Sequence, residues 1–233
     1  IEPRAGEKEH YQDFLNRLGF ITRHLSRRFE GEADFFPAGD RYIFTYGVIR
    51  KQRFVFRKGF PPYCRVYGFR SDFQVLEELK NIVVDREIIP LVLCNEAHYH
   101  GDTVLCAFGP KREYMLAYLN GLEENSRENL LKYYGNSIIS LDESDAKIYA
   151  ANSFQLISEQ GIFLIMPEGI RTALRNEIKA RGVEPILVDV SEFWKKGGGS
   201  VKCMICDLGF LIDDENKPSP EVLSFRETVL YRP

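Results

Sequence analysis

One stretch of the chain restricts the fold more than any other, because its pattern predicts a complete strand–helix–strand unit. Within residues 161–190, the expected strand, helix and second strand lie at 162–166, 167–181 and 185–188. Ile170, Leu174 and Ile178 share one face of this helix, and Pro167 fits its first turn, where a proline loses no hydrogen bond. Two strands joined by a helix at this spacing form a βαβ unit, so the segment predicts an α/β fold.

Segments with the same strand and helix patterns recur along the chain. Strands are predicted at 21–25, 41–46, 88–94, 103–108 and 112–118, and helices at 7–18, 72–79 and 126–133. No Ser/Pro-rich linker separates them, so residues 1–233 are predicted to form a single domain. Two parts lie outside this pattern. They are a basic, aromatic segment at 47–66, interpreted as an inserted hairpin or loop, and a C-terminal tail at 213–233 with one edge strand at 228–231.

The composition is that of an ordinary globular protein. Of the 233 residues, 44% are hydrophobic and 28% are charged, and the net charge is −3. This balance predicts no binding to nucleic acid or to an anionic membrane. No apolar run approaches the roughly 20 residues that are needed to cross a bilayer. The five scattered cysteines form no disulfide pattern, so a reducing, cytoplasmic setting is expected.

A glycine run that ends on a cysteine is the first candidate for chemistry. It spans 196–203, and its glycines would let the backbone turn closely before Cys203. The mostly apolar stretch 201–205 predicts a short buried strand that carries this cysteine. A thiol is mostly protonated at neutral pH, so a nucleophilic Cys203 would need activating groups from elsewhere in the chain.

Cys203 and Cys206 also fit the C-x-x-C pattern of zinc and thiol-redox sites. A zinc site usually needs a second pair of ligands, and Cys94 and Cys106 are too far apart in sequence to form one. We therefore expect no metal, and we interpret Cys94, Cys106 and Cys206 as small buried hydrophobic residues.

Two upstream clusters supply groups that a nucleophilic cysteine needs. His100 and Asp102 are two residues apart. If this segment is a strand, the two side chains share one face and bring a proton-transfer group and an anion to one pocket. His98 would lie on the same face and is the competing histidine. Glu30 and Asp34 form an acidic cluster further upstream.

Four motifs, in this order, resemble the guanidine-modifying pentein superfamily, which includes dimethylarginine dimethylaminohydrolases, arginine deiminases and amidinotransferases. They are Glu30-Gly31-Glu32-Ala33-Asp34, Tyr67-Gly68-Phe69-Arg70-Ser71-Asp72, Tyr99-His100-Gly101-Asp102-Thr103 and Gly197 to Cys203. The resemblance extends from about Glu7 to Cys206 and is strongest to the dimethylarginine dimethylaminohydrolases. It implies a pentein-type α/β propeller, which is a ring of repeated ββαβ units.

The resemblance implies catalytic roles for three residues. Cys203 would attack the guanidinium carbon and form a covalent thiouronium intermediate. His100 would protonate the leaving amine and then activate water. Glu30, favoured over its neighbour Glu32, would hold the guanidinium and assist proton transfer. The family chemistry needs no cofactor.

The resemblance also implies a substrate-binding set of Asp102, Arg70 and Asp34. Asp102 would bind the guanidinium nitrogens, and Arg70 would pair with the substrate α-carboxylate. Asp34 occupies the position of the family's second acid, which is interpreted as structural. Asn152, at a position where relatives also keep Asn, is likewise interpreted as structural.

The chain departs from the family pattern at three places. Glu30 and Asp34 are four residues apart, a longer spacing than in many members, although some dimethylarginine hydrolase-like members share it. Gly101 follows the histidine, where Leu is usual. The first unit normally supplies another substrate-binding acid in a Pro-Asp-x-Val-Phe-like stretch, and no such stretch precedes Glu7. We therefore expect a propeller without its first unit, either as a fragment or as a shortened protein.

The resemblance predicts a cysteine-dependent hydrolase of a small arginine-like guanidine compound. An amidinotransferase would use the same Cys203, His100 and Glu30, with an amine in place of water as the acceptor. A non-catalytic pentein that acts as an interaction protein is the third hypothesis, since a fold alone does not define a function. The substrate and the oligomeric state stay open at this point.

Overall fold

The structure is a computed structural model that describes residues 6–47, 52–55, 58–59, 61, 63–66 and 69–206, and these divide into a small unit, 6–24, and a large unit, 25–206. The small unit contains helix α1 (Glu7–Arg17), after which Gly19 has a φ of 87°. This confirms the predicted helix. No strand forms at 21–25, where the backbone is irregular, so that prediction is wrong.

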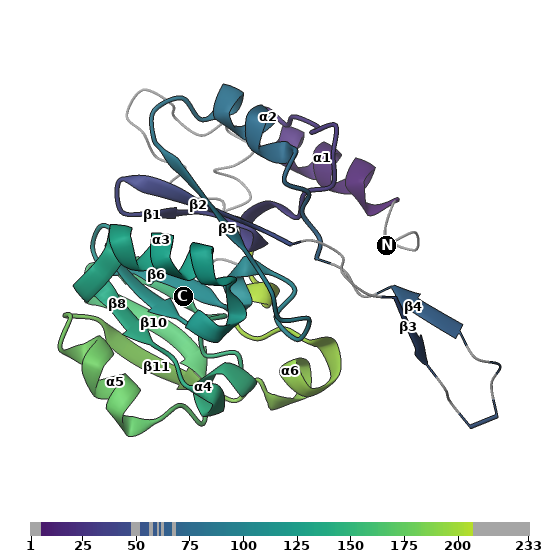
Figure 1. The fold of residues 1–233 in the computed structure, drawn as a ribbon. Coiled ribbons are helices and arrows are strands. Elements are labelled where there is room, and N and C mark those ends of the chain that lie inside the picture. Colours follow the sequence, from purple (N-terminus) through teal and green to yellow (C-terminus); the bar gives the residue numbers. More distant parts are fainter. Residues whose placement is uncertain are drawn as a thin grey trace. The chain divides into compact units, whose positions relative to one another are not determined.

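In its described part, the large unit contains three successive ββαβ units (Figure 1). The first comprises β1 (Phe35–Ala38), β2 (Arg41–Tyr46), α2 (Val75–Ile82) and β5 (Ile88–Val92). The second comprises β6 (Leu105–Phe108), β7 (Tyr114–Ala117), α3 (Glu124–Tyr134) and β8 (Ile138–Ser140). The third comprises β9 (Phe154–Ser158), β10 (Gly161–Pro167), α5 (Thr172–Lys179) and β11 (Glu184–Val188). The predicted mixed α/β fold of repeated ββαβ units is thus confirmed.

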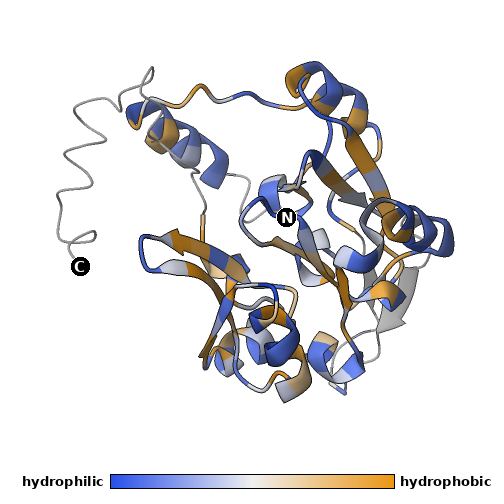
Figure 2. Ribbon diagram, turned by 90° about the vertical axis from the view of Figure 1, so that its left-hand side faces the viewer, coloured by the Kyte–Doolittle hydropathy of each residue, from blue (hydrophilic) through white to orange (hydrophobic). Residues whose placement is uncertain are grey.

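The strand pairing is the same in all three units. The first two strands are antiparallel, and the third lies parallel to the second. A parallel neighbour requires a crossover connection, which the helix of each unit provides. The middle strand is paired on both sides and supplies fully buried residues, such as Phe44, Leu116 and Leu164. Figure 2 shows that the strands are mainly hydrophobic, whereas the helices carry both hydrophobic and hydrophilic residues.

The predicted insertion at 47–66 contains an antiparallel hairpin, β3 (Gln52–Val55) and β4 (Tyr63–Val66). The hairpin lies between β2 and α2 in sequence, and β2 still pairs with β5 in parallel. The insertion therefore leaves the first ββαβ unit intact. The tail at 213–233, with its predicted strand at 228–231, lies outside the described residues.

Two predicted elements differ from the structure. Pro167 is the last residue of β10, where it pairs with Val188, and the next helix begins only at Thr172. Residues 201–205 contain a 3₁₀ turn, Lys202–Met204, and not a strand. Strands β1, β8 and β9 and the helices α4 (Glu143–Lys147) and α6 (Ser191–Gly197) are not predicted.

Candidate active site

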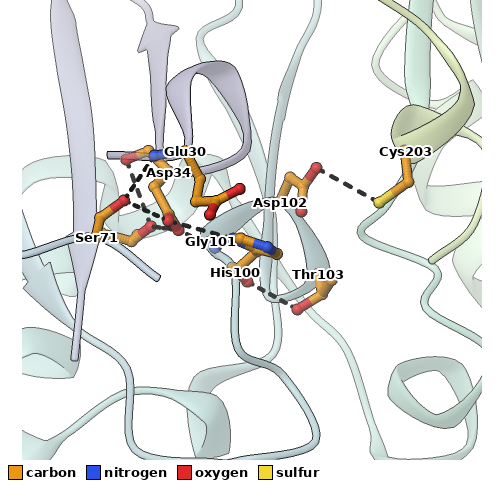
Figure 3. A network of polar contacts seen from close by, with 9 residues as sticks. Glu30, Asp34, Ser71, His100, Gly101, Asp102, Thr103 and Cys203 are labelled. Carbon is orange, nitrogen blue, oxygen red and sulfur yellow. Dashed lines mark hydrogen bonds and ion pairs between the residues drawn. The ribbon is translucent and has the colours of Figure 1, made fainter. Parts of the chain in front are cut away.

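The candidate residues lie on turns that occupy similar positions in successive ββαβ units. Residues 30–34, here the acid turn, form a 3₁₀ turn before β1. Residues 100–103, the histidine turn, form another before β6. Residues 151–153 precede β9, and residues 198–204, the cysteine turn, follow α6. Hydrogen bonds join these segments, and Figure 3 shows those between the acid turn and the histidine turn. The repeated topology thus brings residues that are far apart in sequence to one place.

The Asp34 carboxylate joins the acid turn to the histidine turn. Its Oδ1 accepts hydrogen bonds from Thr45 Oγ1 at 2.8 Å and from the Gly101 backbone N–H at 2.8 Å. Its Oδ2 accepts from Ser71 Oγ at 2.7 Å and lies 3.2 Å from His100 Nδ1 (Figure 3). Asp34 is only 1% exposed. These four groups therefore take the place of the water molecules that the carboxylate loses on burial.

The same contacts explain why a glycine follows His100. A Cβ atom on Gly101 would lie 2.1 Å from Thr45 Oγ1 and 2.7 Å from Thr45 Cγ2. Thr45 thus fills the space that a side chain at position 101 would need, and from there it donates to Asp34. The departure from the family's usual Leu at this position therefore has a local packing cause.

His100 is held with Nδ1 toward Asp34, which leaves Nε2 for a reacting group. Burial tends to lower the pKa of His100. The hydrogen bond to Asp34 and the nearby negative charges of Asp34, Asp102 and Glu30 outweigh burial and raise this pKa above its ordinary value. A histidine held in this way can exchange a proton near neutral pH.

The histidine turn does not have the strand geometry under which His100 and Asp102 would share one face. His100 has extended backbone angles, φ −130° and ψ 151°, and Gly101–Thr103 then forms a 3₁₀ turn. The Thr103 hydroxyl closes the turn by donating to the His100 carbonyl at 2.7 Å. The His100 and Asp102 side chains nevertheless lie at the same site, between the acid turn and the cysteine turn (Figure 3).

Asp102 and Cys203 form the other half of the site. Asp102 Oδ2 lies 3.9 Å from Cys203 Sγ, and Asp102 Oδ1 is buried with no hydrogen-bond partner in the described part of the chain. Burial is the main cause that raises the pKa of Asp102 to about 7. Desolvation of the sulfur, followed by the charge of Asp102, raises the pKa of Cys203 to about 11, although this residue is partly open to solvent. The thiol is therefore protonated at neutral pH.

Asn152 fixes the cysteine turn against the histidine turn. Its Oδ1 accepts from the backbone N–H groups of Ser200 at 2.8 Å and of Cys203 at 3.1 Å. Its Nδ2 donates to the Asp102 carbonyl at 3.4 Å, and its own carbonyl accepts from the Lys202 N–H at 3.1 Å. Asn152 is fully buried. These contacts set the position of the Cys203 backbone, which agrees with the interpretation of Asn152 as structural.

Two glycines shape the cysteine turn in different ways. Gly198 has a φ of 74°, a left-handed conformation that favours glycine. A Cβ atom on Gly199 would lie 2.7 Å from Cys203 Cβ and 2.8 Å from its Sγ. The glycine run thus allows both the reversal of the chain and the close packing of the thiol.

Glu30 reaches the site from the acid turn. Its backbone N–H donates to Ser71 Oγ at 3.2 Å, which anchors the start of the turn. Its carboxylate projects toward His100 and Asp102 (Figure 3). The structure therefore brings together Glu30, His100, Asp102 and Cys203, with Asp34 behind the histidine.

Arg70 is connected to the site through Tyr99. Its guanidinium carbon lies 5.4 Å from the centre of the Tyr99 ring, within the range of a cation–π contact. The Tyr99 hydroxyl donates to the Gly198 carbonyl at 3.4 Å. Arg70 is therefore linked to the cysteine turn through the ring of Tyr99, a motif residue to which the sequence analysis gave no role.

Thr45 and Ser71 are the partners of Asp34 that the sequence analysis missed. Thr45 is one residue of the apolar strand β2 and belongs to no motif, whereas Ser71 lies in the motif Tyr67 to Asp72 but was given no role. The competing His98 is 5% exposed and packs against the rings of Tyr118 and Tyr149. Burial lowers the pKa of His98, so the geometry favours His100 over it.

The remaining cysteines only partly match the prediction. Cys106 is buried, but Cys94 and Cys206 are exposed, so their interpretation as buried residues is wrong. Within the described ranges, no cluster of three or more His, Cys, Asp or Glu side chains could hold a metal ion. No helix in the same ranges is long and apolar enough to cross a membrane.

The sequence matches a known protein family. Residues 66–210 match a family model described as N,N dimethylarginine dimethylhydrolase, eukaryotic. The chain belongs to this family. The predicted membership of the guanidine-modifying pentein superfamily is thereby confirmed.

Two curated relatives are similar over most of the chain. An N(G),N(G)-dimethylarginine dimethylaminohydrolase of Mycobacterium tuberculosis is 26% identical over 208 residues, which are 88% of this chain and 58% of the relative. A bifunctional arginine dihydrolase/ornithine cyclodeaminase, AgrE of a Nostoc species, is 24% identical over 91% of this chain and 27% of its own length. The chain thus spans little more than half of the first relative and about a quarter of the second.

Solved structures share the fold. Unliganded AgrE has a TM-score of 0.73 at 22% identity, with 94% of this chain and 29% of that chain covered. A dimethylarginine dimethylaminohydrolase variant in an adduct with S-methyl-L-thiocitrulline has a TM-score of 0.59 at 21% identity, with 88% and 66% covered. The mixed α/β fold is therefore similar to that of pentein structures.

Proposed function

We propose that this protein hydrolyses a carbon–nitrogen bond of an arginine-like guanidine, with Cys203 as nucleophile and His100 as general acid and base. One observation carries the proposal: His100, oriented by Asp34, lies at the same site as the Cys203–Asp102 pair. The family and the mycobacterial relative, which is named as a dimethylarginine dimethylaminohydrolase, support this substrate class. We propose further that the three ββαβ units belong to a pentein propeller.

The reaction begins at the Cys203 sulfur. The thiolate forms a carbon–sulfur bond to the guanidinium carbon, and the carbon–nitrogen bond to the leaving amine breaks as the amine takes a proton from His100. Water then attacks the same carbon and gives a proton to His100. The carbon–sulfur bond breaks, and the released amine takes up the second proton of the attacking water. The products are a ureido compound, an ammonium ion and the regenerated thiolate.

The acids of the site divide into two roles. Glu30 and Asp102 project into the site and would bind the guanidinium nitrogens, since carboxylates accept paired hydrogen bonds from a guanidinium. Both oxygens of Asp34 are occupied by groups of the protein. We therefore assign Asp34 to orienting His100. Arg70 would pair with the substrate α-carboxylate.

Substrate charge would activate the site. The pKa of Asp102 is raised to about 7 and that of Cys203 to about 11, because burial disfavours both anions. A guanidinium placed between them would favour the carboxylate and the thiolate. The free thiol would then be nearly inert at neutral pH and become nucleophilic when a cationic substrate is bound.

The test is product formation from a panel of guanidines that includes methylated arginines, arginine and agmatine. We expect a ureido product and an amine, and loss of turnover in Cys203→Ser. Cys206→Ser is the matched control, because this exposed cysteine lies three residues further along the chain. Turnover that appears only with an added amine would favour an amidinotransferase. No product and no covalent adduct on Cys203 would favour the non-catalytic hypothesis.

A further inference from the structure

An ion pair links the two turns that carry Glu30 and Cys203. Lys202 immediately precedes Cys203 in the cysteine turn, and Glu32 follows Glu30 by two residues in the acid turn. Lys202 Nζ pairs with Glu32 Oε1 across 170 residues of sequence. Glu32, the alternative to Glu30 for the catalytic glutamate in the sequence analysis, is therefore paired with a lysine in the structure.

The environment of Lys202 differs from that of the other lysines whose ion pairs are seen in the described residues. Its side chain is 14% exposed, against 44% for Lys179 and 77% for Lys196. The ammonium lies 5.5 Å from the centre of the Phe154 ring at the start of β9. Desolvation of an ammonium group is unfavourable, so this arrangement costs free energy that a surface lysine avoids.

The partly buried ammonium of Lys202 acts on the proposed reacting groups. Lys202 is adjacent to Cys203, and it acts to lower the pKa of both Cys203 and Asp102 against the stronger effect of burial. The other titratable groups that act on the thiol are Asp102, Tyr99 and Tyr149. Hydrogen bonds from Asn152 and from the Ser200 backbone also oppose the desolvation of the sulfur, and Lys202 adds a positive charge to them.

We propose that Lys202 is a positioning residue, oriented by Glu32, whose ammonium supplies positive charge to the Cys203 thiol. The pair also ties the acid turn to the cysteine turn. This inference rests on the proposed nucleophilic role of Cys203. Because Glu32 partly neutralises the ammonium, the two residues act on the thiol in opposite directions: Lys202 favours the thiolate and Glu32 disfavours it.

The test is the pH dependence of Cys203 alkylation by iodoacetamide in the full chain. Mass spectrometry with peptide fragmentation separates Cys203 from Cys206. Lys202→Met should raise the apparent pKa of the thiol by about one unit, which is roughly a tenfold loss of thiolate at pH values below it. Glu32→Gln should lower that pKa by about half a unit, because the ammonium is no longer neutralised.

Lys196→Met is the matched control, since Lys196 pairs with Glu192 but both side chains are exposed. It should leave the profile unchanged. A purely structural ion pair would make both site variants shift in the same direction, or not at all, and either result overturns the inference. If Lys202→Met fails to fold, Glu32→Gln decides alone: a lower pKa supports the inference and any other result overturns it. Opposite shifts in a protein without turnover would overturn only the proposed hydrolase function.

Discussion

Asp34 and Asp102 are two buried carboxyl groups at similar positions, before the first strands of the first and second ββαβ units. Asp34 accepts from Thr45, Gly101 and Ser71 and faces His100. Asp102 has one oxygen 3.9 Å from a thiol and one with no partner in the described ranges. Two turns at similar positions in the fold thus hold one satisfied acid and one unsatisfied acid.

This difference suggests a structural role for Asp34 and a chemical role for Asp102 within one site. A buried carboxylate with a full set of donors is stable as an anion and can orient a neighbour. Asp102, a buried carboxyl group without hydrogen-bond partners, destabilises the folded protein when it is charged. Its raised pKa of about 7 means that a bound cation would favour the carboxylate. Substitutions at the two positions should therefore have opposite effects on stability.

The largest expected effect is at Asp34. Asp34→Ala leaves the donors of Thr45, Gly101 and Ser71 unpaired in a buried place, so it should lower the free energy of unfolding by about 3–5 kcal/mol. Denaturant unfolding at neutral pH measures this loss. A loss below about 1 kcal/mol would show that the network can be replaced by water, and the comparison with Asp102 would fail.

Asp34→Asn is the isosteric control for this variant. It keeps the volume and the Oδ1 acceptor, so its stability should stay closer to that of the wild type. It cannot accept from His100 Nδ1–H, which should invert the tautomer of the ring and reduce turnover about a thousandfold or more. Nitrogen NMR of the imidazole reports the tautomer independently of turnover.

The effect at Asp102 should have the opposite sign and depend on pH. The pKa of Asp102 is 3.8 in the unfolded reference and about 7 in the folded protein. The folded state therefore holds the proton more tightly, and stability falls as pH rises from about 4 to 7. Asp102→Asn lacks this fall, so it should stabilise the protein by on the order of 2 kcal/mol at pH 8 and by little at pH 4.

Unfolding curves of wild type and Asp102→Asn over this pH range measure the difference directly. Parallel curves would mean that Asp102 is solvated in the folded state. The same variant should lose turnover, because the amide carries no negative charge for a guanidinium. Higher stability combined with lower activity is the expected signature of a functional, unsatisfied acid.

The smallest expected effect is at Ser71. Ser71→Ala removes one donor to Asp34 and the acceptor of the Glu30 N–H, so it should cost about 1 kcal/mol of stability. Ser158→Ala is the control, because this hydroxyl is exposed and accepts only a local bond from Gln160 N–H. Thermal unfolding compares the two. Equal losses would indicate that the Asp34 network adds nothing beyond an ordinary surface bond.

The sequence predicted the fold well where periodicity was strong. The elements β2, β10, α1 and α3 lie close to their predicted ranges, whereas the short β1, β8 and β9 carry no readable pattern. The predicted site residues Glu30, His100, Asp102 and Cys203 lie together in the structure. The local conformation was predicted wrongly for Cys203, which lies in a 3₁₀ turn where a strand was expected.

By itself, the sequence determined the repeated α/β pattern, the order of the motifs and the family to which they point, since these depend on local periodicity and residue type. Only the tertiary structure decided which acid is satisfied, which glutamate pairs with Lys202 and what Asn152 holds in place. These contacts join residues of different ββαβ units. They arise because packing the units together brings the turns into contact. No local sequence pattern shows which residues of distant turns will meet.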